Sequence, residues 1–162
     1  MSLDPKGSTT IERVDLYPTP LWMSNIGVNT QQERKVSLNE DLLSFIRGEY
    51  DKNPDSPKKS NRQGGWQSRT DLHKEPAMNE LGQQVFNVCK TIFPDITGMN
   101  ITQMWAAINH YWSTAKIHKG EWHWRLPVES DLMLWPPYLD HFVEPSKSKD
   151  PRVMISFDIK FT

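Results

Sequence analysis

The chain has 162 residues, a formal net charge of -1 and a hydrophobic fraction of 36%, which suits one domain with a buried core and gives no support for a nucleic-acid partner. No apolar run reaches the roughly 18 residues that a membrane span requires, and no secretory signal pattern opens the chain, so no membrane partner is expected. The single cysteine, Cys89, excludes an internal disulfide and favours a cytoplasmic location.

The first half of the chain predicts one strand and then a helix. Residues 11–23 alternate loosely between apolar and polar and contain two prolines. They predict an edge strand, because proline cannot donate a hydrogen bond to a sheet. Ser37 and Glu40 form a capping-box pattern before apolar residues at helical spacing. This pattern predicts a helix that ends at Gly48.

A second helix is predicted between Pro76 and Pro94. Proline is accepted in the first turn of a helix, and a proline also ends this apolar pattern. One face of the predicted helix carries a stripe of Leu81, Val85, Val88, Cys89 and Ile92. Because Cys89 belongs to this stripe, we interpret it as a packing residue and not as a nucleophile.

From Ile101 onward the sequence consists of short apolar runs, aromatic residues and prolines, a pattern typical of strands. Residues 153–161 alternate strictly between apolar and polar, which is the clearest strand pattern in the chain. The predicted fold class is therefore mainly β with flanking helices. We expect a single domain over residues 1–162, in which about residues 11–100 support the strands of about residues 101–162.

Histidine is concentrated in the second half of the chain, where four of the five histidines lie: His110, His118, His123 and His141. Imidazole is the commonest nitrogen ligand of zinc, copper and iron, so this concentration indicates a metal site. Aromatic-rich sheets also accept histidine as a packing residue, and each histidine taken alone favours that interpretation.

The most informative positions are His141 and Arg152. His141 follows an aromatic and proline-rich corner at residues 135–140, and such a rigid corner suits a metal ligand. Arg152 opens the alternating strand and shares a face with Ser156. An arginine on a buried strand face needs an anion, which a dicarboxylate would supply in a bidentate pair. A surface ion pair with Asp150 is the alternative.

Two segments resemble the C-terminal signature of a 2-oxoglutarate/Fe(II)-dependent oxygenase family of marine bacteria and phages. They are residues 131–145 (DLMLWPPYLDHFVEP) and residues 152–158 (RVMISFD). Three upstream segments resemble the family more loosely: residues 64–68 (GGWQS), 105–109 (WAAIN) and 116–122 (KIHKGEW). The resemblance covers roughly residues 64–160.

The resemblance implies a double-stranded β-helix, the jelly-roll or cupin-like fold, with a helical N-terminal portion. It implies that His141 is the distal ligand of Fe(II) and that His118 is a proximal ligand. It also implies that Arg152 and Ser156 hold the cosubstrate 2-oxoglutarate. The implied activity is hydroxylation of a small-molecule or peptide substrate.

The resemblance further implies an aromatic substrate pocket, to which Trp122, Trp135 and Tyr138 would contribute. The residues from Trp105 onward are fewer than eight regular strands with their loops would require, so we expect either a reduced barrel or missing segments between about residues 109 and 131. The residue between Glu129 and Asp131 is not the glycine that the family has at this turn.

The proximal ligand motif departs from the family pattern. Lys116 stands where the family places another histidine, and Gly120 stands where a His-x-Asp motif would place a carboxylate. The third ligand is left open among three residues: Glu121, His110 and His123.

These departures motivate a second hypothesis, a non-catalytic cupin-like binding module that has lost a metal ligand. A third hypothesis is an aromatic-lined β-sandwich that binds sugars. A homodimer is compatible with each of the three.

Overall fold

The structure is a computed structural model. It describes residues 11–16, 19–26, 37–56, 65–109, 115–119, 121–125, 128–143 and 150–162, and of residues 15–16, 115–119, 121–125, 140 and 142–143 it describes the backbone alone. The chain forms two compact units. The first comprises Met1–Ser37 and Trp112–Lys147, and the second comprises Leu38–Tyr111 and Ser148–Thr162.

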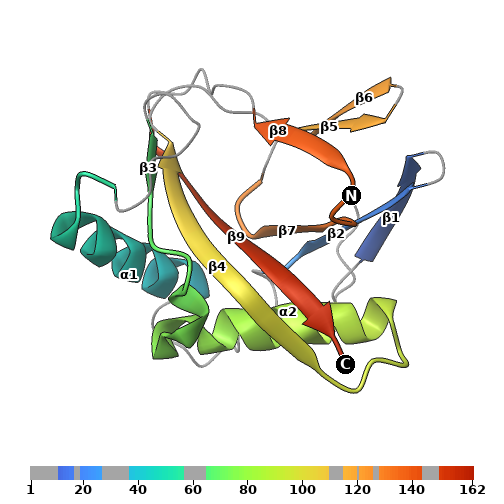
Figure 1. The fold of residues 1–162 in the computed structure, drawn as a ribbon, viewed down its shortest axis with the longest axis horizontal. Coiled ribbons are helices and arrows are strands. Elements are labelled where there is room, and N and C mark those ends of the chain that lie inside the picture. Colours follow the sequence, from blue (N-terminus) through green and yellow to red (C-terminus); the bar gives the residue numbers. More distant parts are fainter. Residues whose placement is uncertain are drawn as a thin grey trace. The chain divides into compact units, whose positions relative to one another are not determined.

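The first unit contains two antiparallel sheets of three strands (Figure 1). One sheet has the order β1-β2-β7, with β1 at Ile11–Leu16, β2 at Thr19–Asn25 and β7 at Asp131–Leu134. The other has the order β6-β5-β8, with β5 at Ala115–Lys119, β6 at Glu121–Arg125 and β8 at Asp140–Val143.

The expectation of one edge strand over residues 11–23 is wrong, because this segment forms the paired strands β1 and β2. β2 is the central strand of its sheet, although it contains Pro20. The proline is tolerated because β7 pairs with β2 only from Trp22 to Asn25. Pro20 therefore lies beyond the stretch in which β2 needs donors on both sides.

A small apolar cluster holds the turn that leads into β8. Leu139 is 2% exposed and packs with Leu21 and Met23 of β2. The Leu139 N–H donates to the carbonyl of Pro136 at 3.0 Å, which closes the turn after the two prolines. The apolar side chain is thus buried two positions before His141, so the start of β8 is fixed by packing.

The turn before β7 takes a conformation that usually favours glycine. Ser130 has a φ of 67°, which lies in the left-handed region that few residues other than glycine adopt. Its carbonyl accepts a hydrogen bond from the Ile26 N–H at 3.0 Å, and Asp131 N–H donates to the carbonyl of Val128 at 3.1 Å. Ser130 thus adopts the left-handed conformation at the turn where a glycine was expected.

The second unit contains two helices and one antiparallel sheet of order β3-β4-β9. Its elements are α1 (Leu38–Lys52), β3 (Gly65–Gln67), the short 3-10 helices η2 (Leu72–Lys74) and η3 (Pro76–Met78), α2 (Asn79–Ile92), β4 (Met99–Asn109) and β9 (Arg152–Phe161). β4 and β9 run side by side over almost their whole length (Figure 1). The strand predicted over residues 153–161 is confirmed.

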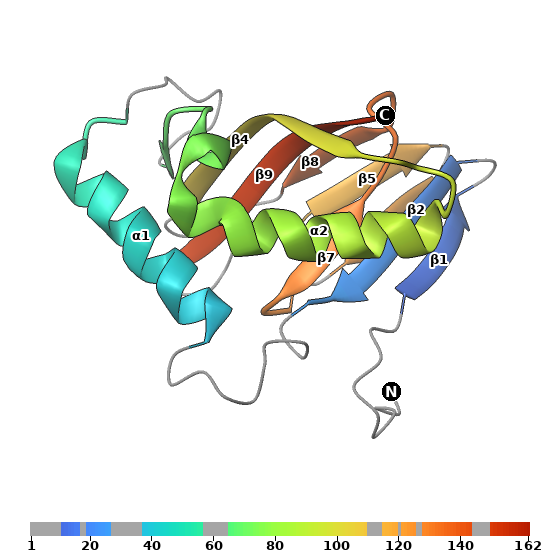
Figure 2. The ribbon, with the colours of Figure 1, turned by 90° about the horizontal axis from the view of Figure 1, so that it is seen from below.

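One face of this sheet is apolar and is covered by α2 (Figure 2). Gly82 of α2 lies so close to the sheet that an added Cβ would be 3.6 Å from Ile101 Cδ1. Phe93, which follows α2, packs against Phe161 with 5.2 Å between the ring centroids. The register shifts between Ile101 and Gln103. This bulge keeps Met104 on the same face as Ile101, because it adds one residue to the alternation.

The helix predictions are largely confirmed. α2 buries Leu81, Val85, Val88 and Cys89 of the predicted stripe, whereas Ile92 is only partly buried. α1 begins at Leu38 as the capping box predicts, but it does not end at Gly48 and continues to Lys52. A glycine stops a helix when the chain must turn there, and here the following residues remain helical.

The fold is mixed α and β, not mainly β as expected. The described strands form three separate three-stranded sheets, and a closed barrel is not seen among them. The expected strands after Ile101 and the flanking helices are present. Among the described residues, no helix is long and apolar enough to cross a membrane.

The position of Gly48 within α1 generates a stability prediction. A Cβ added at Gly48 would meet nothing within 4 Å, so Gly48→Ala should stabilise the protein by about 0.5–1 kcal/mol through lower entropy of the unfolded chain. Thermal denaturation should show a higher melting temperature. Gly98→Ala is the contrasting variant, because its Cβ would lie 2.6 Å from Thr162 Oγ1 and that side chain would have to move. A lower melting temperature for Gly48→Ala would contradict the continuous helix.

The burial of Cys89 predicts an inert thiol. Cys89 is 0% exposed, and burial raises the pKa of its thiol to about 11. Because the thiolate is the reactive form, a water-soluble disulfide reagent should not react with the native protein at neutral pH. One equivalent of thiol should appear after unfolding in urea. Rapid labelling of the native protein would show that α2 opens readily.

Candidate functional site

The face of the second unit's sheet opposite the helices is polar. Register partners in an antiparallel pair share a face. Arg152 lies opposite Asn109, Met154 opposite Ala107, and Ser156 opposite Trp105. Arg152 and Ser156 therefore share one face, as the alternation predicted. Ala107 is 3% exposed and Asn109 is 7% exposed, so this polar face is partly shielded from solvent.

Arg152 runs along its strand in the direction of Ser156. Its Nη2 lies 2.6 Å from the Sδ atom of Met154, two residues further on. The Cα atoms of residues four apart on a strand are separated by about 13 Å. A guanidinium that leans along the strand spans part of this distance. A ligand with a carboxylate could then contact both the guanidinium and the Ser156 hydroxyl.

Asn109 was not predicted, although it is the register partner of Arg152. Its Nδ2 atom is buried and has no hydrogen-bond partner in the part of the chain that the structure describes. A buried donor without a partner costs about 1–3 kcal/mol. The amide lies directly over Gly65 of β3, where a Cβ would approach Asn109 Oδ1 to 2.7 Å. A residue with a Cβ at this place would require the amide to shift.

The side chains of Trp66 and Ser68, from the upstream segment 64–68, have structural roles. Trp66 is 4% exposed, and its Nε1 donates to the carbonyl of Asn53 at 2.7 Å. Ser68 is buried, and its Oγ accepts the Ala106 N–H at 2.9 Å while donating to the carbonyl of Arg69. Both side chains connect neighbouring segments of the second unit, so neither is available to a ligand.

A second arginine of this unit, Arg69, has a purely structural set of partners. Its guanidinium pairs with Glu49 at 3.1 Å, with Asp71 at 2.9 Å and with Glu75. The hydrogen bond with Glu75 is the main cause that raises the pKa of Arg69. Because three carboxylates share the guanidinium, Arg69 is not a candidate for binding a substrate anion.

His141 lies at the start of β8 in the first unit and is exposed. Its Nδ1 lies 3.0 Å from the carbonyl oxygen of Leu139. Its ring packs against Trp135 with 4.8 Å between the centroids. If Nδ1 carries the proton and donates it to that carbonyl, Nε2 presents a lone pair. Metal-binding histidines are commonly oriented in this way.

The strands that carry His118 and His141 pair directly, because β5 and β8 are antiparallel neighbours. In the register, His118 is opposite Asp140, and His141 is opposite Ile117. Partners share a face and neighbours alternate. The register therefore does not bring positions 118 and 141 to the same face. Position 123 on β6 is opposite Ile117, so it lies in the same row as position 141.

The other predicted site residues lie in the first unit or outside the described residues. Trp135 is partly buried and Tyr138 is 63% exposed. Trp122, Glu121 and His123 lie on β6, of which the backbone alone is described.

His110 lies outside the described residues. Within the described residues, no group of three His, Cys, Asp or Glu side chains could hold a metal ion. Of the residues predicted as metal ligands, His141 is the one whose side chain the structure describes.

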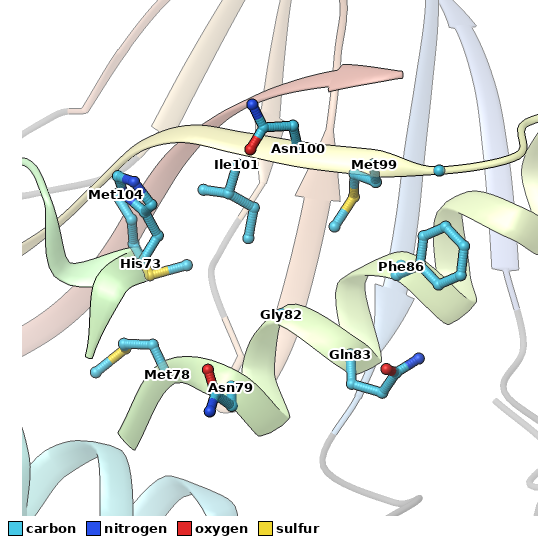
Figure 3. A pocket seen from close by; sticks show the side chains of 11 residues that line it. His73, Met78, Asn79, Gly82, Gln83, Phe86, Met99, Asn100, Ile101 and Met104 are labelled. Atoms are coloured by element: carbon cyan, nitrogen blue, oxygen red, sulfur yellow. The ribbon is translucent and has the colours of Figure 1, made fainter. Parts of the chain in front are cut away.

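A pocket of about 390 Å³ lies on the helix-covered face of the second unit (Figure 3). Its lining combines apolar and sulfur-containing side chains with a few polar ones, among them Met78, Phe86, Met99, Ile101, Met104 and His73. Met99, Ile101 and Met104 point to the helical side of β4, whereas Asn109 and Arg152 belong to the opposite face. The pocket is therefore separate from the polar face.

Comparison of the chain with protein-family models, with curated proteins and with solved structures finds no match.

The Arg69 cluster predicts a pH-dependent stability. Burial alone raises the pKa of Glu49, but hydrogen bonds from Arg69 and Lys52 outweigh it and lower the pKa below 4.5. A carboxylate whose pKa is lower in the folded than in the unfolded protein stabilises the fold at pH values above the unfolded-state pKa. This contribution is lost as the pH falls through the folded-state pKa. Arg69→Met should therefore destabilise the protein at neutral pH by roughly 1–3 kcal/mol.

Urea denaturation of both proteins at about pH 7 and about pH 4 measures this effect, and the difference in unfolding free energy should shrink at the lower pH. Lys52→Met is the control, because the Lys52 side chain is 69% exposed and surface ion pairs contribute little. A difference that is independent of pH would exclude Glu49 as its source.

Proposed function

We propose that the protein is an Fe(II)- and 2-oxoglutarate-dependent oxygenase whose cosubstrate is held by the polar face around Arg152. The single observation that carries the proposal is the placement of Arg152, Ser156 and the partnerless Asn109 amide on one partly shielded face of a sheet. Guanidinium, hydroxyl and amide donors are the groups that bind a carboxylate. A dicarboxylate cosubstrate fits this donor set.

The order of strand pairing supports a double-stranded β-helix as the parent fold. Among the strands from β4 onward, the outer strands in sequence, β4 and β9, pair with each other. The strands β5 and β8, which lie between them in sequence, form a second pair. Nested antiparallel pairs of this kind arise when a long hairpin is rolled up into a jelly roll. The proposed fold is thus a reduced jelly roll with α1 and α2 as its helical portion.

The roles of the chain's own residues follow from their chemistry. Arg152 would pair with the distal carboxylate of 2-oxoglutarate, and Ser156 would donate a hydrogen bond to it. His141 would present Nε2 as a nitrogen ligand, and His118, which the resemblance implies as a second ligand, could join it only if β5 shifted by one residue against β8. Bound Fe(II) would supply the activation of O2 for oxidation of the substrate. Trp122, Trp135 and Tyr138 are proposed to contact the substrate, which we expect to be a small molecule or peptide.

The register of β5 and β8 favours a second candidate function, a non-catalytic module that binds a dicarboxylate without iron. Because positions 118 and 141 fall on different faces in this register, one metal ion could not bind both without a local shift of one residue. The two candidates share the carboxylate site and differ in the metal. Metal content therefore distinguishes them.

The proposal predicts binding of 2-oxoglutarate through Arg152. Removing a charged hydrogen-bond donor costs about 1.5–3 kcal/mol, so Arg152→Gln should weaken binding by roughly 10–100-fold in calorimetric titration. Arg47→Gln is the matched control, since Arg47 is an exposed residue of α1. Equal affinity of the Arg152→Gln variant and the unaltered protein would remove the basis of the proposal.

The same titration with Fe(II) added under anaerobic conditions separates the two candidates. An oxygenase should bind one Fe(II) and develop a weak visible absorption band when 2-oxoglutarate is added, and His141→Ala should abolish the band. Binding of 2-oxoglutarate without any uptake of Fe(II) would favour the non-catalytic module.

A further inference from the structure

We infer that the pocket between α2 and β4 is a second binding site, which takes a small, uncharged aromatic molecule. This site is independent of the proposed function, because the pocket lies on the helix-covered face of the sheet and Arg152 belongs to the opposite face. Every lining residue belongs to the part of the second unit between Leu38 and Tyr111. The second unit therefore forms the pocket by itself.

The pocket is large enough for a bicyclic ring system. Its volume is about 390 Å³, whereas packed protein interiors contain few voids larger than one water molecule. Pockets for small molecules typically have volumes of about 300–1000 Å³. An apolar cavity of about 150 Å³ already holds benzene. Two fused aromatic rings therefore fit into the space between α2 and β4.

The walls of the pocket are apolar and partly open to solvent. Met99, Ile101 and Met104 point from β4 toward α2, and Met78 and Phe86 lie on the helical side (Figure 3). Met78 is 1% exposed and Met104 is 0% exposed, so these two form the floor. Phe86, Met99 and Ile101 are only partly buried. An apolar ligand would remove their remaining exposed surface from water, which is favourable.

The lining favours an aromatic ligand without charge. Methionine sulfur makes favourable contacts with aromatic rings, its flexible side chain adapts to the shape of a ligand, and Phe86 can add a ring pair. Among the described residues that line the pocket there is no Asp, Glu, Lys or Arg. A charged ligand would lose hydration here without gaining a counter-charge. The polar lining side chains, which suit one neutral hydrogen-bonding group, are His73, Asn79, Gln83 and Asn100.

A glycine keeps the pocket open at the wall that α2 provides. Asn79, Gly82, Gln83 and Phe86 line the pocket at helical spacing. Glycine inside a helix is less favourable than alanine. Alanine would fit at position 82, because its Cβ would lie at an ordinary contact distance of 3.6 Å from Ile101 Cδ1. That contact would, however, join α2 to β4 across the pocket.

Titration of the full-length chain with 2-naphthol tests this assignment by NMR of methyl-labelled methionine. The chain has seven methionines, and a bound aromatic ring shifts the signals of the methyl groups close to it. The signals of Met78, Met99 and Met104 should shift, and those of the other four should not. Shifts at other methionines in place of these three, or no binding of 2-naphthol, would overturn the inference.

Two further probes test the chemical class of the ligand in calorimetric titrations. 2-Naphthoate has the same rings and a negative charge, so it should bind roughly tenfold or more weakly than 2-naphthol. 1-Octanol is uncharged but not aromatic, and it should also bind more weakly. Tighter binding of either probe than of 2-naphthol would contradict an uncharged aromatic ligand.

Gly82→Ala tests the site itself, with Gly48→Ala in α1 as the matched control. Both variants should raise the melting temperature without ligand, since each replaces a glycine within a helix. Gly82→Ala alone should weaken binding of 2-naphthol roughly tenfold, because one methyl group more or less in an apolar pocket has effects of this size. A Cβ at Gly48 meets nothing within 4 Å, so its variant should bind 2-naphthol as the unaltered protein does.

The outcomes for this site and for the proposed function are independent. Equal affinity of Gly82→Ala and the unaltered protein for 2-naphthol would overturn the pocket assignment and leave binding of 2-oxoglutarate through Arg152 untouched. Absence of 2-oxoglutarate binding would remove the proposed function and leave the methionine shifts as expected. Shifts of the pocket methionines by 2-oxoglutarate would contradict a site for uncharged ligands.

Discussion

The antiparallel pairing of β4 with β9 is the constraint on which the second unit depends. It joins residues that are about fifty positions apart in sequence, from Met99 opposite Phe161 to Asn109 opposite Arg152. Since neighbouring side chains in a strand point to opposite faces, this one register sets both the apolar face under α2 and the polar face with the arginine. A slip of one residue would exchange the two faces.

The bulge between Ile101 and Gln103 shows how the sequence maintains this division. The apolar residues of β4 do not follow a simple alternation, because Ile101 and Met104 are three apart and still face the same helix. An extra residue in the strand corrects the phase. The helices therefore cover one continuous apolar surface, and the polar side chains are collected on the other.

The elements that could be predicted from sequence are those whose signal is local. The alternation of residues 153–161 and the apolar stripe of α2 each identify an element without knowledge of its partners. Arg152 and Ser156 could be assigned to one face for the same reason. The hairpin of β1 and β2 was missed because two prolines suggested a single edge strand, and the end of α1 was misplaced because Gly48 suggested a stop.

What could not be predicted depends on pairing between distant segments. The importance of Asn109 follows from its position opposite Arg152 and over Gly65, and neither relation is visible in sequence spacing. Gly65, the partly buried glycine next to Trp66, is the sequence feature that could have indicated a close approach. Likewise, the row that contains His118 is decided by the register of β5 and β8 and not by the histidine spacing.

The contact between Leu139 and His141 has a consequence for how the imidazole is held. The oxygen that fixes the ring belongs to a residue whose side chain is part of the small core with Leu21 and Met23. The direction of Nε2 is thus coupled to the rigidity of that core, although the histidine itself is at the surface. Warming that loosens the core would free the ring to rotate before the strands separate, so the orientation of Nε2 would be lost at temperatures where the secondary structure is still intact.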